Sequence, residues 1–303
     1  MELRHLRYFV AVAEELNVGR AAQRLHISQP PLSRQIQQLE LNLNVRLFRR
    51  ERKRMHLTPV GRAFLDEAKS LLEASDRAVR VAQRAERGEV GRLRIGFIES
   101  AITTGFLGDV LLRFRKERPD VEIELSELVS LEQAEAVRSG RMDVGFVYTR
   151  PVDVSGLTFD LLVPGKLVAA VARSNALSKH ARIPLRVFSK QPLIIGRRDL
   201  SPRLYDSVMM RVRSTGCEPK VAQHTIQFQT TVSLVAAELG VGVVPSSFAA
   251  SRSPGVVYRA VQDLNLAMNM ELMWRQNEDS PVVRAFLDAV QSSRKHLGGQ
   301  RSA

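Results

Sequence analysis

The stretch AAQRLHISQPPLSRQIQQLE, residues 21–40, decides how the N-terminal part of the chain folds. Upstream, residues 1–26 show apolar side chains at helical spacing in two blocks and predict two helices. Ser28 is placed as the N-cap of a third helix, whose first turn tolerates Pro30 and Pro31 because the N–H groups there have no helical partner. One face of this third helix is apolar and is formed by Leu32, Ile36, Leu39 and Leu43. The paired alanines at the start of the stretch allow close helix crossing, which favours a helix-turn-helix over two unrelated surface helices.

The opposite face of the third helix carries polar side chains that suit the major groove of DNA. Arg34 can read guanine with two hydrogen bonds, Gln37 can read adenine, and Ser33 can reach bases or phosphates. The residues predicted to contact DNA from this helix and its start are Ser28, Gln29, Pro30, Pro31, Ser33, Arg34 and Gln37.

Residues 46–54 follow directly and hold six basic side chains in nine positions. Such a charge run is often only a solvated face, but its position straight after a recognition-type helix predicts the wing of a winged helix-turn-helix. A wing of this kind supplies phosphate contacts, and therefore affinity without sequence preference. The predicted phosphate-contacting residues are Arg50, Arg52, Lys53 and Arg54.

The overall charge agrees with a nucleic-acid partner. The 303 residues carry 45 Lys and Arg against 32 Asp and Glu, a net charge of +13. Residues 1–58 alone hold 11 basic and 5 acidic side chains, and residues 59–90 hold equal numbers of each. The remaining net charge of +7 is spread over 213 residues. An Arg-rich composition that only reflects a GC-rich genome is the alternative explanation.

The cellular setting is bounded by what the sequence lacks. A single cysteine, Cys217, cannot form an intramolecular disulfide, which favours a reducing compartment. The sequence has no signal-peptide core and no apolar run of the roughly 18 residues needed to cross a bilayer. We therefore expect a soluble cytoplasmic protein that does not bind membranes.

Residues 59–88 predict one long helix, with Thr58 as N-cap, Pro59 at the first position and Gly88 as the stop. Small and apolar residues recur along it with coiled-coil spacing, at Phe64, Ala68, Leu71, Ser75, Ala78, Ala82 and Ala85. This seam predicts a homodimer, although one helix packed on its own body would show a similar stripe. A dimer would place two recognition helices on a near-palindromic site.

Beyond residue 90, short apolar strands alternate with helix-length segments, which is typical of a doubly wound α/β sheet. We expect a DNA-binding domain at residues 1–58, a dimerising linker helix at 59–89 and an effector-binding domain at 90–303. The last would have two lobes. Lobe I is expected at about 90–162 and 268–303, and lobe II at about 163–267. Ligands bind such sheets where strands end and helices begin.

The stretch at 21–40, followed by LFRR, LTPVG, LRIGF and SGRMDVGF, resembles the LysR-type transcriptional regulators over essentially the whole chain. The resemblance implies a winged helix-turn-helix, a dimerising linker helix and a two-lobed effector domain like a periplasmic binding protein, assembled as a homotetramer. Pro30 and Pro31 resemble the branch that controls catabolism of aromatic acids through catechol and muconate. Asn44 stands where the family often has Gly, and Asn tolerates the left-handed conformation of that turn. Glu99 is a second departure, because its charge disfavours a purely anionic effector.

The resemblance also implies an effector pocket. Its predicted residues are Ser100, Ala101, Ser130, Phe146, Pro202 and Gln229. Independently of the family, Ser100, Ser130, Ser201 and Gln229 are predicted helix starts, whose free N–H groups favour a carboxylate. Hydroxyl groups at such positions can equally be plain N-caps, and Phe146 can equally be core.

These features predict a DNA-binding activator of transcription that responds to a small effector, such as an aromatic acid or a muconate-like carboxylate, and that can contact RNA polymerase. An enzyme is disfavoured because no catalytic motif occurs, the six histidines are scattered, and no metal or cofactor site is indicated. A regulator of the same family with a non-aromatic or non-acid effector, or a DNA-binding protein without an effector, stays open.

Overall fold

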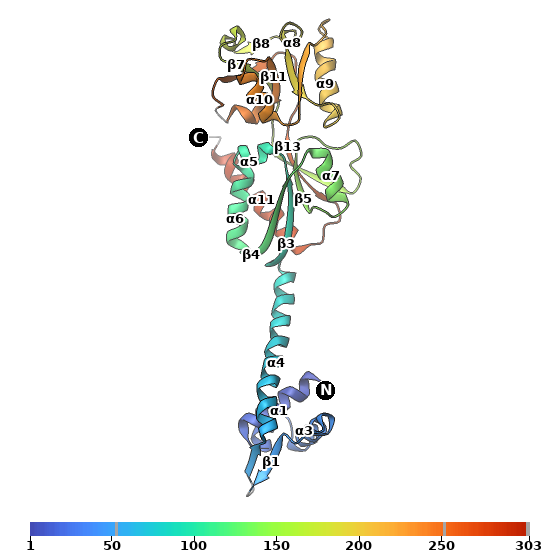
Figure 1. Cartoon of the computed structure of the whole chain (residues 1–303), viewed down its shortest axis with the longest axis vertical. Coiled ribbons are helices and arrows are strands. Elements are labelled where there is room, and N and C mark those ends of the chain that lie inside the picture. Colours follow the sequence, from blue (N-terminus) through green and yellow to red (C-terminus); the bar gives the residue numbers. More distant parts are fainter. Residues whose placement is uncertain (52–53, 251–252, 301–303) are drawn as a thin grey trace. The chain divides into compact units, whose positions relative to one another are not determined.

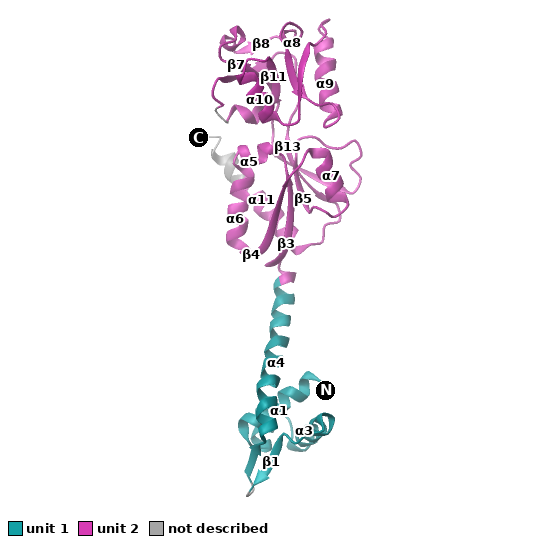
Figure 2. Cartoon of the chain, viewed as in Figure 1, with its two compact units in different colours: residues 1–84 teal, residues 85–303 magenta. Residues whose placement is uncertain are grey.

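The computed structural model describes residues 1–51, 54–250 and 253–300. The chain divides into two compact units, residues 1–84 and 85–303 (Figure 2). Each unit has its own hydrophobic core.

The first unit is a three-helix domain with a two-stranded hairpin and the start of a long helix. Its elements are α1 (Leu3–Glu15), α2 (Val18–Arg24), α3 (Gln29–Leu43), β1 (Phe48–Glu51), β2 (Arg54–Leu57) and α4 (Pro59–Glu86). The core includes Phe9, Leu32, Leu39 and Leu47, all fully buried. The predicted apolar face of α3 is therefore the packed one.

Local signals set the ends of these helices. The side chain of Asn17 caps α2 by accepting hydrogen bonds from two backbone N–H groups. Asn44 ends α3 with φ +52°, the left-handed conformation expected for it. The Thr58 hydroxyl accepts a hydrogen bond from the Gly61 N–H at 2.8 Å and donates to the Arg46 carbonyl at 2.7 Å, which caps α4 against the start of the hairpin.

The second unit contains two sheets, and each forms a lobe (Figure 1). The strands of lobe I are β3 (Val90–Phe97), β4 (Asp120–Glu127), β5 (Val144–Val147), β6 (Leu157–Val163) and β13 (Met270–Arg275), in the order β4-β3-β5-β13-β6. Its helices are α5 (Glu99–Thr103), α6 (Phe106–Glu117), α7 (Ser130–Arg138) and α11 (Pro281–Gln300). Helices α6 and α11 cover one face of this sheet, whereas α7 packs on the other.

Lobe II is built on a six-stranded sheet in the order β10-β9-β11-β7-β12-β8. Its strands are β7 (Leu167–Ala172), β8 (Arg182–Ile183), β9 (Leu193–Gly196), β10 (Val221–Thr225), β11 (Val241–Pro245) and β12 (Val256–Val261). Its helices are the short η1 (Ala176–Lys179), α8 (Val187–Lys190), α9 (Pro202–Arg213), α10 (Phe228–Ala236) and η2 (Ser246–Ala249).

The chain crosses between the lobes twice, from β6 to β7 and from β12 to β13. The long excursion between these crossings forms lobe II, and β13 then returns to the first sheet between β5 and β6. The predicted fold class, a winged helix-turn-helix followed by a two-lobed α/β domain, is confirmed. None of the helices in the described residues combines the length and apolar character needed to span a membrane.

Candidate functional site

The predicted DNA-binding surface of the first unit centres on α3. The side chains of Ser28, Gln29, Arg34 and Gln37 are exposed, as are the two prolines of the first turn, and Ser33 is half-buried. Ser28 occupies the N-cap position of α3, but its side chain makes no capping hydrogen bond. Its hydroxyl is therefore available to another partner.

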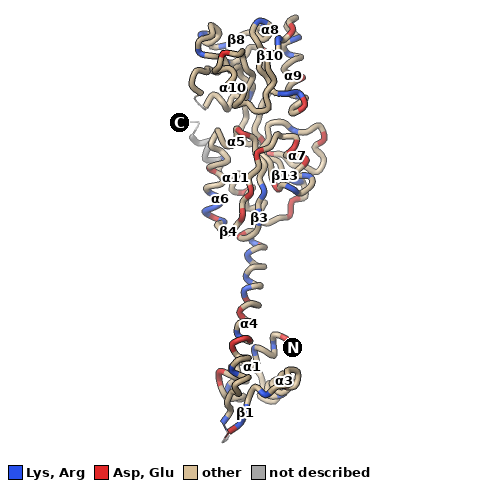
Figure 3. The backbone as a smooth tube through the Cα atoms, in the orientation of Figure 1, with Lys and Arg blue, Asp and Glu red and all other residues tan. Residues whose placement is uncertain are grey.

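The β1–β2 hairpin forms the predicted wing. Arg50 and Arg54 are exposed, and neither has an acidic partner among the described residues. The predicted contacts Arg52 and Lys53 lie outside the described residues. Figure 3 shows basic positions along this hairpin.

Glu40 is a residue of this surface that the sequence patterns did not single out. Its side chain is only 8% exposed. One carboxylate oxygen accepts hydrogen bonds from the N–H groups of Leu47 at 2.7 Å and Phe48 at 3.0 Å, and the other pairs with Arg46 at 3.1 Å. A carboxylate inside the last turns of α3 thus fixes the start of the wing relative to the recognition helix.

The predicted seam of α4 divides into two parts. Phe64 and Ala68 pack into the core of the first unit. Further along, Leu71 of the seam is 46% exposed, and Val79, which follows the seam residue Ala78, is 53% exposed. The seam therefore packs on its own domain at the start of α4 and presents uncovered apolar side chains beyond it.

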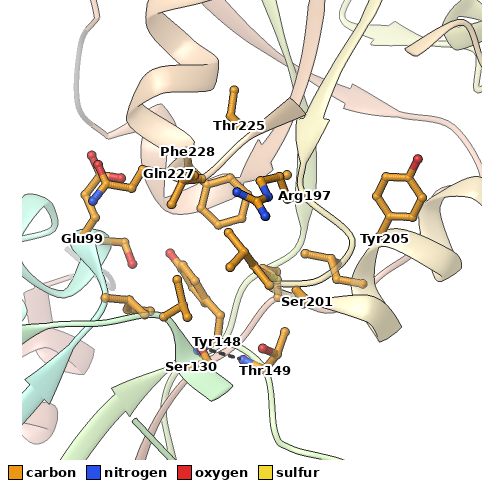
Figure 4. A pocket seen from close by; sticks show the side chains of 18 of the residues that line it. Glu99, Ser130, Tyr148, Thr149, Arg197, Ser201, Tyr205, Thr225, Gln227 and Phe228 are labelled. Carbon is orange, nitrogen blue, oxygen red and sulfur yellow. Dashed lines mark hydrogen bonds between the residues drawn. The ribbon is translucent and has the colours of Figure 1, made fainter. Parts of the chain in front are cut away.

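A cavity of about 380 Å³ lies between the two lobes (Figure 4). Lobe I contributes Glu99, Ser130, Tyr148 and Thr149, and lobe II contributes Arg197, Ser201, Tyr205 and residues 225–228. The apolar part of the wall comprises Ile98, Leu128, Val129, Leu167, Ile195, Leu200, Leu204, Val208, Val243 and Met268.

Tyr148 and Phe228 meet across the cleft. Their rings are arranged edge to face with centroids 6.0 Å apart, and the Tyr148 hydroxyl is 2.7 Å from Ser247 Oγ of lobe II. Burial raises the pKa of the Tyr148 phenol, more than the neighbouring hydroxyl groups of Ser100 and Ser247 lower it. Tyr148 is thus a neutral hydroxyl group at the contact between the lobes, which the sequence patterns did not identify.

Three serines line the cavity, and they differ in whether their hydroxyl groups have hydrogen-bond partners. Ser100 is 1% exposed, and its Oγ lies beside Tyr148 without reaching the geometry of a hydrogen bond with any described residue. Ser201 Oγ is likewise buried without a partner, and it does not cap α9. Ser130 Oγ accepts a hydrogen bond from the Tyr148 N–H at 3.1 Å rather than capping α7. The N-cap explanation of these hydroxyls therefore has no matching hydrogen bond.

The other predicted pocket residues lie near the cavity without lining it. Ala101 is fully buried in the lobe I core, and Phe146 is buried against Phe106 and Phe286 because both faces of β5 are covered by helices. Pro202 and Gln229 each follow a lining residue, Ser201 and Phe228 respectively. Pro202 and Gln229 thus lie in turns that border the cavity, but in both cases the adjacent residue lines it.

The charged groups of the cavity are mostly acidic. Glu99, Glu127 and Glu132 of lobe I line it, together with Arg197 of lobe II, whose guanidinium is held by Asp199. Burial raises the pKa of Glu99, with a further rise from Glu127, against the lowering effect of a hydrogen bond from the Gln229 N–H. Among the described residues, no three His, Cys, Asp or Glu side chains meet as a metal site would require.

The positive charge outside the first unit is concentrated rather than spread. Residues 163–267 hold 14 Lys and Arg against 5 Asp and Glu, whereas residues 90–162 and 268–303 together hold 14 against 16. Lobe I is therefore slightly acidic and lobe II strongly basic.

A winged helix-turn-helix joined to a two-lobed domain with a cavity between its lobes defines a DNA-binding regulator with a ligand-binding domain. Residues 3–62 match the family model described as "Bacterial regulatory helix-turn-helix protein, lysR family", and residues 86–295 match "LysR substrate binding domain". The chain belongs to the LysR family of transcriptional regulators, which confirms the resemblance.

Relatives and solved structures match over nearly the full chain. The regulator AlsR of Bacillus subtilis is 34% identical, covering 95% of this chain and 94% of AlsR. TfdS of Cupriavidus pinatubonensis is 37% identical, covering 96% and 98%. The crystal structure of full-length CbnR with its target DNA aligns with a TM-score of 0.78 at 30% identity, covering 97% of this chain and 100% of CbnR. These relatives are named as transcriptional regulators.

Proposed function

We propose that the protein is an effector-responsive activator of transcription whose effector is a small carboxylic acid, aromatic or muconate-like, bound between the lobes. The observation that carries the proposal is the pair of buried hydroxyls, Ser100 Oγ of lobe I and Ser201 Oγ of lobe II, which line one cavity without a partner. Burying a polar group without a hydrogen bond costs about 1–3 kcal/mol. A ligand with polar groups at both ends would remove this cost in both lobes at once.

The acid end of the ligand would bind where Ser201, Arg197 and the first turn of α9 converge. Free N–H groups at the start of a helix and the positive end of its dipole favour a carboxylate. The Ser130 hydroxyl keeps its own proton free to donate, because it acts as the acceptor toward Tyr148. The apolar wall would hold the body of the ligand.

On the DNA side, the recognition helix α3 would contact bases and the wing would contact phosphates. The proposed contacts are Ser28, Gln29, Pro30, Pro31, Ser33, Arg34, Gln37, Arg50, Arg52, Lys53 and Arg54. CbnR, a relative with matching architecture, is described in complex with its target DNA. Residues 1–58 would act as the DNA-binding domain and residues 59–89 as the dimerising linker.

Assembly would proceed through the exposed part of the α4 seam to a homodimer on a near-palindromic site, and then to a homotetramer. Effector binding would change the angle between lobe I (about 90–162 and 268–303) and lobe II (about 163–267), and with it the spacing of the two DNA-bound dimers. A ligand shifts such an equilibrium only by its differential affinity for the two states. The altered DNA bend would then favour contact with RNA polymerase.

A thermal-shift screen of the full-length protein against benzoate, salicylate, muconate and aliphatic acids tests the effector half of the proposal. A bound acid raises the apparent Tm by mass action. The shift should disappear in Ser201→Ala and persist in Ser126→Ala, which changes an exposed serine of lobe I. If no acid shifts the Tm of the wild-type protein, the effector is not a small acid of these classes.

A further inference from the structure

We propose that the effector is a zwitterion, whose carboxylate binds at the Ser201 end of the cavity and whose ammonium group sits between Glu99 and Glu127. This inference rests on the proposed function and names the chemistry of the second end of the same ligand. It predicts that the cavity binds an acid with an amino group more tightly than a dicarboxylate such as muconate.

Two carboxylates of lobe I converge on the first turn of α10 in lobe II. Glu99 Oε2 accepts a hydrogen bond from the backbone N–H of Gln229 at 3.2 Å. Glu127 Oε1 accepts one from the side-chain amide of Gln227 at 2.8 Å. Because Gln227 and Gln229 are two residues apart, both carboxylates lie at the same corner of the cleft, and each retains an oxygen free for another donor.

The negative charge at this corner is uncompensated. Across the described part of the chain, neither of these carboxylates forms an ion pair, and Glu132 on the same side of the cavity forms none either. Arg197, the basic residue lining the cavity, donates hydrogen bonds to Asp199 through Nε and Nη2, two of its three guanidinium nitrogens. Burial raises the pKa of Glu99, and Glu127 raises it further, as expected where no cation offsets the charge.

A buried polar group beside this corner indicates a missing ligand. Ser100 follows Glu99 directly in the chain, is 1% exposed, and lines the cavity with its Oγ unpartnered. A hydroxyl group accepts hydrogen bonds as well as donating them, so Ser100 Oγ can accept one from an ammonium group. A second carboxylate at this position would instead be repelled by Glu99 and Glu127.

The two ends are arranged across the cavity. Figure 4 shows Glu99 on one side and Arg197 and Ser201 on the other, with Tyr148 and Phe228 between them. A ligand spanning this direction would place its apolar body against the two rings, its carboxylate toward lobe II and its ammonium toward Glu99. An aromatic acid whose ammonium and carboxylate groups lie at opposite ends of the ring has this order of groups.

Calorimetric titration of the full-length protein with three matched probes tests the inference. The probes are 4-(aminomethyl)benzoate, a zwitterion, terephthalate, a dicarboxylate of the same outline, and benzoate, which has a carboxylate alone. The zwitterion should bind more than about tenfold tighter than terephthalate. In Glu99→Gln and in Glu127→Gln this preference should shrink by more than about fivefold, whereas Glu117→Gln, on the exposed end of α6, should retain it.

The outcomes separate the inference from the proposed function. Tighter binding of benzoate or terephthalate than of the zwitterion would overturn the ammonium site and leave the acid-binding function standing. An unchanged preference in both folded glutamine variants would also overturn it. If no probe binds to the wild-type protein or to either variant, both the inference and the proposed acid effector fail.

Discussion

Replacing Glu40 by alanine should detach the wing from the recognition helix. The carboxylate is almost fully buried and accepts hydrogen bonds from the N–H groups of Leu47 and Phe48. Each buried donor left unpaired costs about 1–3 kcal/mol, and the Phe48 amide is only partly buried. We therefore expect the local free energy of opening of the wing to fall by about 2–4 kcal/mol. The ion pair with Arg46 adds little, because that arginine is 82% exposed.

Hydrogen exchange of the full-length protein measures this effect locally. Since 1.4 kcal/mol corresponds to a factor of ten, the amides of residues 47–51 and 54–57 should exchange about 30-fold faster or more in Glu40→Ala. Glu51→Ala is the matched control, because it removes an exposed wing carboxylate that pairs with Arg49. Unchanged protection in Glu40→Ala, or an equal loss in Glu51→Ala, would refute the assigned role of Glu40.

Further predictions concern DNA reading, packing and pH. Arg34→Ala should lower DNA affinity by about 1–3 kcal/mol and relax sequence preference. Arg50→Ala should weaken binding to all DNA sequences alike and reduce the slope of log affinity against log salt concentration by about 0.9. Fluorescence anisotropy on specific and random DNA distinguishes the two effects. Gly61→Ala would place a Cβ 2.1 Å from a backbone carbonyl oxygen and should lower the free energy of unfolding of the first unit by more than about 1 kcal/mol. Gly108→Ala has open space around the new Cβ and should raise the free energy of unfolding of the second unit by up to about 1 kcal/mol. Denaturant titrations measure both changes. The raised pKa of Glu99 lets the folded state bind a proton more readily than the unfolded chain does. The Tm of the wild-type protein relative to that of Glu99→Gln should therefore be highest at acidic pH and should fall as pH rises through the raised pKa. Parallel Tm profiles of the two proteins would contradict this.

The elements that the sequence predicted best are those specified by local signals. The start of α3 after Ser28 and the left-handed end at Asn44 depend on residues within one or two turns. The Thr58 cap is likewise visible in the motif that contains it. The order of strands in the two sheets depends on pairing between distant segments, and no local pattern specifies it.

The residues of the cleft were harder to predict because they depend on how two lobes meet. Helix starts were placed within one residue, but whether Ser201 or Pro202 faces the cavity is a property of the folded turn. Phe146 lies in core because β5 is covered on both faces. Tyr148 acts through a contact with the other lobe, and Glu40 through contacts beyond the end of its own helix, which helical periodicity does not reveal.

DNase I footprinting of the full-length protein on its selected DNA site, with and without the acid that gives the largest thermal shift, tests most directly whether the cleft controls the DNA-bound assembly. The account predicts that the acid changes the length and hypersensitive sites of the footprint. It also predicts that Ser100→Ala binds the same DNA with near-normal affinity but gives one footprint under both conditions. An identical wild-type footprint with and without the bound acid would contradict the account.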